Sequence, residues 1–364
     1  MASIALRTPL MGIALFILAW LLAMAPALLY PWSHPNQQPL LSVPSAVQAR
    51  KFSVGFSLQS SYGAAVVIFE DPNGELQTHA SVHHGCKEYR AVMAKLSLLS
   101  SRHLAPPYQD NGEYFDDQPR RAVRNALKKL GLPASYEVGV LAGVIQHLRS
   151  ELELAYSIRI SEAVFTSSHL LGLYQDDLMD MADHVGIKYV TPKNQFKPII
   201  WETAAAYAGY GLGMCEHWED DDWCRKDFED IPGITLLAVH YSRNALTVSL
   251  VPVRNAIGAF EPDFLHDENF TLGSDAISGY SHPEDYWSGV KDLLLYTMRT
   301  FPGFPKPDKI MITGDMAHEN FMNFLEETIT QYMGFVPPII SEEAQLAAAK
   351  GAAEFMRRGP APWS

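Results

Sequence analysis

From residue 52 onward the sequence alternates between two hydrophobic patterns, and this alternation constrains the fold more than any other feature. Short runs rich in β-branched and aromatic residues are typical of strands, whereas apolar residues three and four apart are typical of helices. We expect strands at 52–58, 63–70, 137–141, 162–166, 234–241, 245–251 and 309–313. We expect helices at 87–100, 117–130, 140–157, 174–185, 201–212, 284–301, 316–333 and 341–357. Strands and helices that follow one another in this way predict an α/β fold.

Two stretches, 52–70 and 234–251, each have the pattern of a β-hairpin that is followed by helices. The sequence therefore allows two similar halves, each opening with a hairpin. In the first stretch the polar break Gln59-Ser60-Ser61 separates two apolar runs, and a hairpin could hold a phosphate there. The triplet Pro72-Asn73-Gly74 predicts a turn.

The composition is that of a globular protein, with 48% hydrophobic and 19% charged residues in a chain of 364. The formal net charge is -13, from 28 basic and 41 acidic residues. Because nucleic-acid binding needs basic surface to neutralise phosphates, this balance predicts no nucleic-acid partner. The sequence contains no P-loop, dinucleotide fingerprint or G-x-S-x-G motif.

The N-terminus contains an uncharged and mostly apolar stretch from Leu10 to Tyr30, preceded by Arg7. About 20 such residues span the hydrocarbon core of a bilayer as a helix. We therefore predict a single-pass anchor through residues 10–30 with a lumenal or extracellular body. The small residues of Ala25-Pro26-Ala27 also fit a cleavage site, so a removed signal and a secreted protein are the alternative.

Two features of the body agree with a lumenal location. Asn269-Phe270-Thr271 is an acceptor triplet for N-glycosylation. Cys215 and Cys224 flank the acidic segment CEHWEDDDWC, whose length allows a disulfide in an oxidising compartment. Two free thiols in a solvated loop fit the same spacing.

Two consecutive segments resemble the nucleotide-binding domain of the seventy-kilodalton heat-shock chaperones, in the actin-like ATPase superfamily. The segment SEAVFTSSHLLGLYQDDLMDMADHVGIKYV, 161–190, is similar to a strand, helix and strand of that family. The segment IIWETAAAYAGYGLG, 199–213, resembles its helix with an acidic residue, small alanines and a Tyr-Gly-Leu end. The opening hairpin resembles its first phosphate hairpin, with Gly55, Leu58 and Tyr62 in place.

Later segments follow the order of the same family. Residues 236–251 take the place of its second phosphate hairpin, 309–329 resemble its adenosine segment, and 341–358 resemble its last small-residue helix. The resemblance implies an α/β, actin-like ATPase fold, with two lobes around a cleft and an N-terminal hydrophobic helix before them. The implied organisation is an anchor or signal at 1–30, a linker at 31–50, a first lobe at 51–200, a second, reduced lobe with the final helix at 201–358, and a tail at 359–364.

The resemblance also identifies the positions at which a nucleotide would be bound. These positions are Ser57, Gln59, Ser60, Ser61, His240, Ser242, Arg243, Asn244, Gly314, Asp315 and His318. Magnesium on ATP phosphates prefers carboxylate oxygens, acting directly or through water. The family has an Asp in each hairpin where this chain has Ser57 and His240, so we expect no metal site. Side chains also replace the glycines that let backbone N–H groups close around phosphate.

One acidic residue of the family pattern is retained, at Glu202. In the family this residue relates the nucleotide site to movement of the lobes, which makes Glu202 the candidate catalytic residue. A carboxylate could position water, but without a metal it does not supply the missing charge stabilisation. Glu202 also fits a helix N-terminus, where acidic residues are favoured by the helix dipole. Both interpretations remain open.

Two functions follow from this pattern. The first is a membrane-associated, non-hydrolysing binding or scaffolding protein with an unknown protein partner and no cofactor. The second is an active ATPase or kinase-like enzyme that binds ATP or ADP and neutralises phosphate with His240 and Arg243. The loss of both metal-facing acids together with loop glycines favours the first.

Overall fold

The fold is seen in a computed structural model of the chain, which describes residues 51–103, 117–190, 199–256, 265–300 and 303–358. The chain divides into two units, 1–49 and 50–364, and the fold reported below belongs to the second. The predicted hydrophobic helix at 10–30, the linker at 31–50 and the tail at 359–364 lie outside the described residues. Among the described residues, no helix is both long and apolar enough to cross a membrane.

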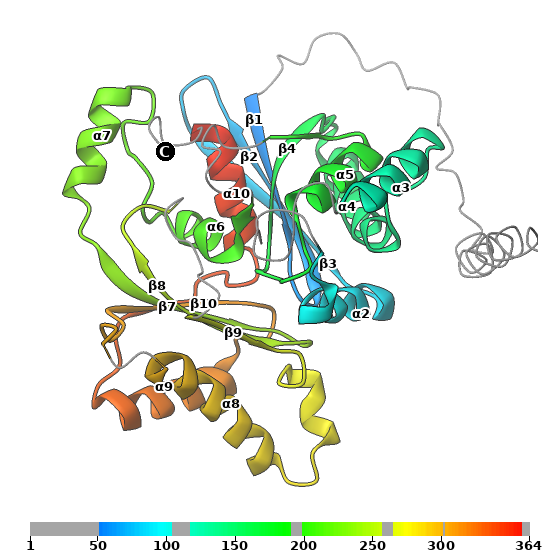
Figure 1. The fold of residues 1–364 in the computed structure, drawn as a ribbon. Coiled ribbons are helices and arrows are strands. Elements are labelled where there is room, and N and C mark those ends of the chain that lie inside the picture. The colour runs from blue at the N-terminus through cyan, green and yellow to red at the C-terminus, as the bar shows by residue number, and fades with distance from the viewer. Residues whose placement is uncertain (1–50, 104–116, 191–198, 257–264, 301–302, 359–364) are drawn as a thin grey trace, which may run out of the picture. The chain divides into compact units, whose positions relative to one another are not determined.

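The first sheet has six strands in the order β3-β2-β1-β4-β5, with β6 also paired to β4 (Figure 1). Its strands are β1 (Lys51–Leu58), β2 (Tyr62–Glu70), β3 (Leu76–His84), β4 (Glu162–Ser167), β5 (Lys188–Tyr189) and β6 (Ile200–Trp201). β1, β2 and β3 pair antiparallel, and β4 is parallel to β1.

The second sheet has five strands in the order β11-β10-β7-β8-β9. Its strands are β7 (Ile234–Tyr241), β8 (Leu246–Val253), β9 (His266–Asn269), β10 (Lys309–Thr313) and β11 (Ile339–Ile340). β7, β8 and β9 pair antiparallel, and β10 is parallel to β7. Both sheets thus begin with a hairpin, add a third antiparallel strand at one edge, and place a parallel strand beside the first strand of the hairpin.

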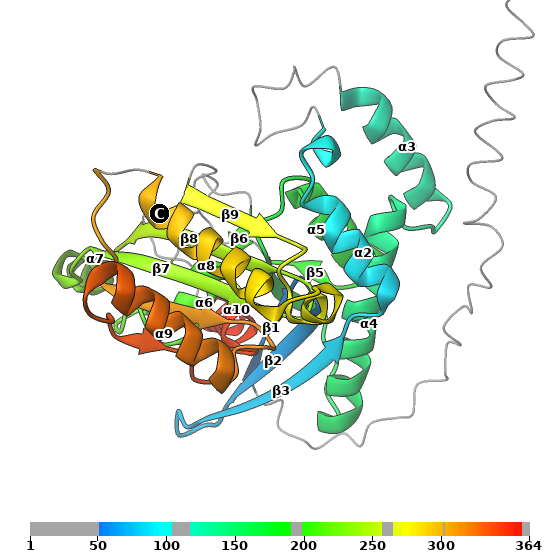
Figure 2. The ribbon, with the colours of Figure 1, turned by 90° about the horizontal axis from the view of Figure 1, so that it is seen from below.

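Helices cover the outer faces of the sheets and also fill the space between them (Figures 1 and 2). Beside the first sheet lie α2 (Lys87–Leu96), α3 (Gln118–Lys129), α4 (Tyr136–Tyr156) and α5 (Gln175–Val185). Beside the second lie α8 (Pro283–Arg299) and α9 (Glu319–Met333). Between the sheets pack α6 (Glu202–Gly209) and α10 (Ala347–Arg358). The remaining elements are α7 (Asp221–Asp230) and the short 3₁₀ turns Leu99–Ser101 and Ser274–Gly279.

The contact between α6 and α10 is made by backbone against backbone. A Cβ on Gly209 would lie 1.9 Å from the carbonyl oxygen of Ala347, and a Cβ on Gly351 would lie 1.6 Å from that of Ala205. Glycine is the residue that permits such a close approach. The small-residue pattern of both helices therefore brings the two sheets close together.

The sequence correctly predicted an α/β fold and both opening hairpins, and it was wrong about residues 137–141. These residues belong to α4, where Val138, Leu141 and Ile145 are buried on one face at helical spacing. Ser135 caps this helix by accepting a hydrogen bond from the backbone N–H of Val138. The β-branched residues suggested a strand, and packing of this face against the first sheet overrode that propensity.

Several elements had no counterpart in the prediction, among them β3, β9, α7 and the two-residue strands β6 and β11. β3 and β9 are edge strands with few apolar residues, and pairing with β2 and β8 specifies them rather than their own hydrophobic pattern. α7 lies in the acidic segment, where the apolar periodicity of a buried helix is weak.

The predicted final helix, 341–357, begins later than expected, at Ala347.

The α6–α10 contact can be tested with one pair of glycine substitutions. Gly351→Ala should lower the free energy of unfolding by at least about 2 kcal/mol, because the new methyl overlaps the backbone of α6. Gly143 lies at an exposed position of α4, with no atom within 4 Å of a new Cβ. Gly143→Ala should therefore raise the free energy of unfolding by about 0.5–1 kcal/mol. Urea denaturation measures both values. Equal effects of the two substitutions would contradict the close contact.

Candidate functional site

The turns of the two opening hairpins contact each other directly. Ser60, in the turn between β1 and β2, has its Oγ 3.0 Å from His240 Nε2 and 2.6 Å from Ser242 Oγ. Asn244, in the turn between β7 and β8, donates from Nδ2 to the Ser60 carbonyl at 3.1 Å. The first turn is also held from its own side, because the Tyr89 hydroxyl donates to the Gln59 carbonyl at 2.7 Å.

The side chains at this contact are almost completely buried although they are polar. Ser60 is 1% exposed, His240 is 4% exposed and Ser242 is fully buried. Buried polar groups are stable only when they are hydrogen-bonded, and these groups bond to one another across the two halves. The facing hairpins therefore form a closed, polar interface.

A buried pair of Glu202 and His240 lies behind the hairpin contact. Glu202 is the first residue of α6, and its Oε1 lies 2.7 Å from His240 Nδ1. Thr313, the last residue of β10, donates its hydroxyl to the same carboxylate oxygen. Ser168, just after β4, donates to Oε2 at 3.1 Å. Elements of both sheets thus contribute donors to one carboxylate.

Gln59 completes the surroundings of this carboxylate from the first hairpin. In the amide orientation that satisfies both of its ends, Nε2 donates to Glu202 Oε2 at 2.7 Å and to Ser168 Oγ at 3.0 Å. Its carbonyl then accepts from the Ser57 hydroxyl. A side chain at position 59 therefore occupies space that a glycine would leave open.

These contacts decide the ionisation of Glu202. Burial by itself raises the pKa of this carboxyl. The charge of His240 and the hydrogen bonds from His240, Thr313 and Ser168 outweigh burial, so the pKa of Glu202 lies below its ordinary value of 4.5. The carboxylate is thus kept ionised by its partners.

Asp315 forms a second buried acidic position at the edge of the interface. Its Oδ1 accepts from the Ser61 hydroxyl at 3.0 Å and from the Arg243 backbone N–H at 3.2 Å. Its Oδ2 lies 3.4 Å from Arg243 Nε and 3.6 Å from His84 Nδ1. Gly314 precedes it with φ +105°, and a Cβ there would lie 2.1 Å from the Tyr241 carbonyl oxygen. A glycine is therefore needed to bring Asp315 to the hairpins.

Most of the residues predicted for a nucleotide site come together at this interface. They are Ser57, Gln59, Ser60, Ser61, Glu202, His240, Ser242, Arg243, Asn244, Gly314 and Asp315. His318 does not join them, since it is exposed at the N-terminus of α9. Ser57 and His240 take the two metal-facing positions of the family that the sequence resembles, but the residue of the first hairpin that contacts His240 is Ser60. Ser168 was missed, because a lone serine after a strand carries no signal of its own.

The described residues contain no group of three or more His, Cys, Asp or Glu side chains arranged to hold a metal ion.

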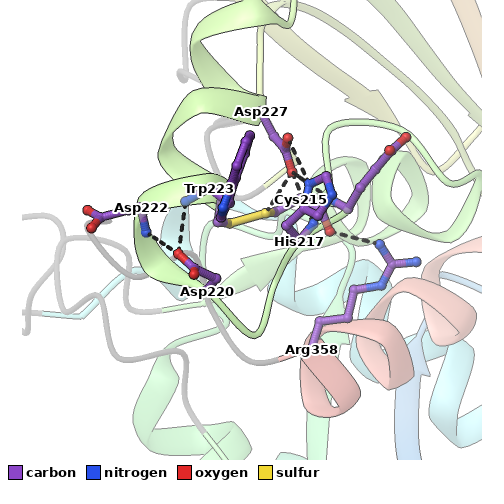
Figure 3. The surroundings of a disulfide bond; sticks show 9 residues. Cys215, His217, Asp220, Asp222, Trp223, Asp227 and Arg358 are labelled. Atoms are coloured by element: carbon purple, nitrogen blue, oxygen red, sulfur yellow. Dashed lines mark hydrogen bonds and ion pairs between the residues drawn. A yellow bond between two sulfur atoms is a disulfide. The ribbon is translucent and has the colours of Figure 1, made fainter.

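A disulfide closes the acidic segment, which decides between the two alternatives for its cysteines (Figure 3). The Cα atoms of Cys215 and Cys224 are 5.3 Å apart, within the range that a disulfide spans. Asp220 caps α7 by accepting from the backbone N–H groups of residues 222 and 223. Arg358, at the end of α10, donates to the Cys215 carbonyl at 3.2 Å. The segment is thus joined to the last helix of the fold.

No protein-family model and no curated protein matches the chain. Among solved structures, it is similar to the ethanolamine utilization protein EutJ from Carboxydothermus hydrogenoformans, with 9% sequence identity and a TM-score of 0.46. The similarity covers 86% of this chain and 92% of that chain. At this identity and score, the similarity says nothing about activity or ligands.

The Glu202–His240 pair predicts a specific dependence of stability on pH. The pKa of Glu202 is lower in the folded state than its ordinary value of 4.5, so ionised Glu202 adds to the free energy of unfolding at pH values above 4.5. This stabilisation is lost as the pH falls below 4.5 through the folded-state pKa. Because glutamine does not titrate, Glu202→Gln should remove the part of the acid-induced loss of stability that comes from this residue. It should also destabilise the protein by about 3 kcal/mol at neutral pH, since it leaves His240 without its buried partner charge.

Urea denaturation at a series of pH values from about 3 to about 7, which spans the titration of a carboxyl group, measures both effects. Glu162→Gln is the matched control, because Glu162 forms an exposed pair with Lys188 at 3.2 Å. Its loss should cost less than about 1 kcal/mol. If the two variants were equally stable at neutral pH, the buried pair would not be holding the interface.

Proposed function

We propose that this chain is a divergent actin-like protein that binds a protein partner and does not hydrolyse ATP. The observation that carries the proposal is the contact between the two hairpin turns through Ser60, His240 and Ser242. In the family that the sequence resembles, phosphates lie between these turns. Here hydrogen-bonded side chains of the protein meet at that position.

The architecture supports the actin-like part of the proposal independently of any single motif. The two sheets have the same strand order, each opens with a hairpin, and the small-residue helices α6 and α10 pack between them. Two halves of the same topology, with their hairpins facing each other, fit the two-lobed fold that the sequence resemblance implies. Fold alone does not specify activity, so the functional part rests on the interface.

Several backbone N–H groups at the two turns, most of them in the second, already donate to acceptors within the protein. Phosphate sites in turns depend on backbone N–H groups that point at the anion. The N–H of Gln59 donates to the Tyr62 carbonyl at 2.8 Å, and that of Arg243 donates to Asp315 Oδ1. The N–H groups of Asn244 and Ala245 both donate to Ser242 Oγ. A phosphate would have to displace these internal acceptors.

The side chains at the two metal-facing positions are also unsuited to magnesium. Ser57 donates its hydroxyl to Gln59, and His240 lies against Glu202 with one ring nitrogen and against Ser60 with the other. Magnesium prefers oxygen ligands in near-octahedral geometry, whereas imidazole suits zinc, copper and similar metals. These side chains support the proposal that the protein binds no magnesium–nucleotide complex.

We test this proposal with nucleotides directly. The purified protein should show no change in melting temperature and no hydrolysis with ATP or ADP, with magnesium or with a chelator. The double variant Ser57→Asp, His240→Asp provides the comparison. It places new carboxylates near Glu202, and nearby like charges repel, so it should be less stable in chelator and regain stability with magnesium.

Two results would overturn the proposal. One is a magnesium-dependent rise in the melting temperature of the wild type with ATP. The other is wild-type hydrolysis that disappears in Glu202→Gln. Either result would favour an active ATPase or kinase-like enzyme in which His240 and Arg243 neutralise phosphate after the hairpins separate.

We further propose that the body lies in the lumen or outside the cell, attached to the membrane through residues 10–30. The apolar sequence of that stretch and the Cys215–Cys224 disulfide support this location, because disulfides persist in oxidising compartments.

The full chain with a C-terminal tag should sediment with membranes, resist carbonate extraction and be protected from protease in intact vesicles. A soluble protein in the medium with a trimmed N-terminus would favour the removed signal instead. Recovery in the cytosol would contradict both.

A further inference from the structure

We propose that Asn269 is a modification site that carries an N-linked oligosaccharide. Asn269 ends β9 and pairs with Leu246 of β8, directly after the second hairpin turn. Its modification rests on the proposed lumenal or extracellular location and not on whether nucleotide binds. The acceptor triplet Asn269-Phe270-Thr271 is common enough in sequences that it does not by itself establish a site. The hydrogen bonds and solvent exposure of the triplet in this fold favour modification of Asn269.

The side chain of Asn269 is held in one orientation by the third residue of the triplet. Its Oδ1 accepts from both the backbone N–H and the hydroxyl of Thr271, each at 2.7 Å. The hydroxyl at this position is what distinguishes an acceptor triplet from any other asparagine. Because Oδ1 is turned toward Thr271, the Nδ2 end of the amide points away from it. Among the described residues, Nδ2 of Asn269 donates no hydrogen bond.

Phe270, the middle residue of the triplet, holds this turn against the body of the protein. Phe270 packs against the apolar core of the first sheet, whereas Thr271 is exposed and Asn269 is partly exposed. Two residues earlier, Asp267 accepts a hydrogen bond from Thr297 of α8 at 2.7 Å, which holds β9 against that helix. The turn is therefore anchored by Phe270, with Thr271 exposed and Asn269 partly accessible to solvent.

The position in the sheet also suits a bulky, soluble group. β9 is the terminal strand of the second sheet and, of the described strands, pairs with β8 alone. An edge strand offers unpaired backbone groups to other chains, and proteins protect such edges with charges, bulges or coverings. Asn269 is the last residue of β9, so an oligosaccharide there lies beside that edge.

Other features of the chain agree with exposure to a compartment where this modification occurs. The Cys215–Cys224 disulfide fits an oxidising compartment, and residues 10–30 have the sequence of an anchor or signal. No other asparagine in the sequence is followed two residues later by Ser or Thr. The inference thus predicts one oligosaccharide at one position.

The transfer is a substitution at the anomeric carbon of a glycosyl diphosphate donor. A bond forms between Asn269 Nδ2 and that carbon, and the bond from the carbon to the diphosphate oxygen breaks. One proton leaves Nδ2 and the diphosphate departs with its electron pair, so no oxidant or reductant is needed. The fold supplies the acceptor, and the host supplies the donor and the transferase.

The experiment compares five matched forms of the full, C-terminally tagged chain made in a eukaryotic secretory host. Wild type should shift in gel mobility after treatment with an amidase that removes N-linked oligosaccharides, and position 269 should then be found as Asp by peptide mass. Asn269→Asp keeps the Oδ1 acceptor but lacks the nitrogen, so its shift should be lost. Thr271→Ala should also lose the shift, whereas Thr271→Ser should retain it.

Asn73→Gln is the control for substitution of an exposed asparagine outside an acceptor triplet, and it should leave the shift unchanged. Thiol labelling of each form reports whether Cys215 and Cys224 are bonded, which separates misfolding from loss of the acceptor. A wild-type protein with a formed disulfide and no mobility shift would overturn the proposal. So would a shift that persists in Asn269→Asp, or a wild type in which Cys215 and Cys224 are free thiols, beside the free Cys86, and which carries no oligosaccharide.

Discussion

The buried pair of Glu202 and His240 is the interaction on which the closed arrangement of the two halves depends. A carboxylate loses its hydration when it is buried, and it remains ionised only if charge and hydrogen bonds replace that hydration. Glu202 meets this need with His240, with the hydroxyls of Thr313 and Ser168, and with the amide of Gln59. Because these donors come from both sheets, satisfying one carboxylate draws the halves together.

Further contacts across the same boundary extend this closure. Arg90 of α2 pairs with Asp275 at 2.7 Å, and Asp315 receives hydrogen bonds from Ser61 of the first hairpin and from the backbone of Arg243. The exposed Arg90–Asp275 pair adds little energy by itself, whereas the buried contacts are costly to break because each would leave a polar group unpaired. Separation of the two halves at this interface would therefore have to break these buried contacts.

The candidate site was predicted from the sequence as a set of positions, but its contacts were not. The sequence resemblance predicted that Ser57 and His240 stand at positions where the chaperone family has metal-facing acids. Within the first hairpin, His240 contacts Ser60 and not Ser57, because the turn at 59–61 brings Ser60 across the interface. A hydrogen-bond partner depends on side-chain direction within a turn, and one residue of register changes that direction.

The sequence by itself determined the elements that carry their own apolar pattern: both opening hairpins, the α/β alternation, and the small residues of α6 and α10. The tertiary structure decided the elements and contacts that depend on a neighbour. β3 and β9 form because β2 and β8 offer unpaired edges, and residues 137–141 are helical because one face of α4 packs on a sheet. The charge state of Glu202 was likewise decided in three dimensions, since its pKa depends on donors that are distant in the chain and adjacent in space.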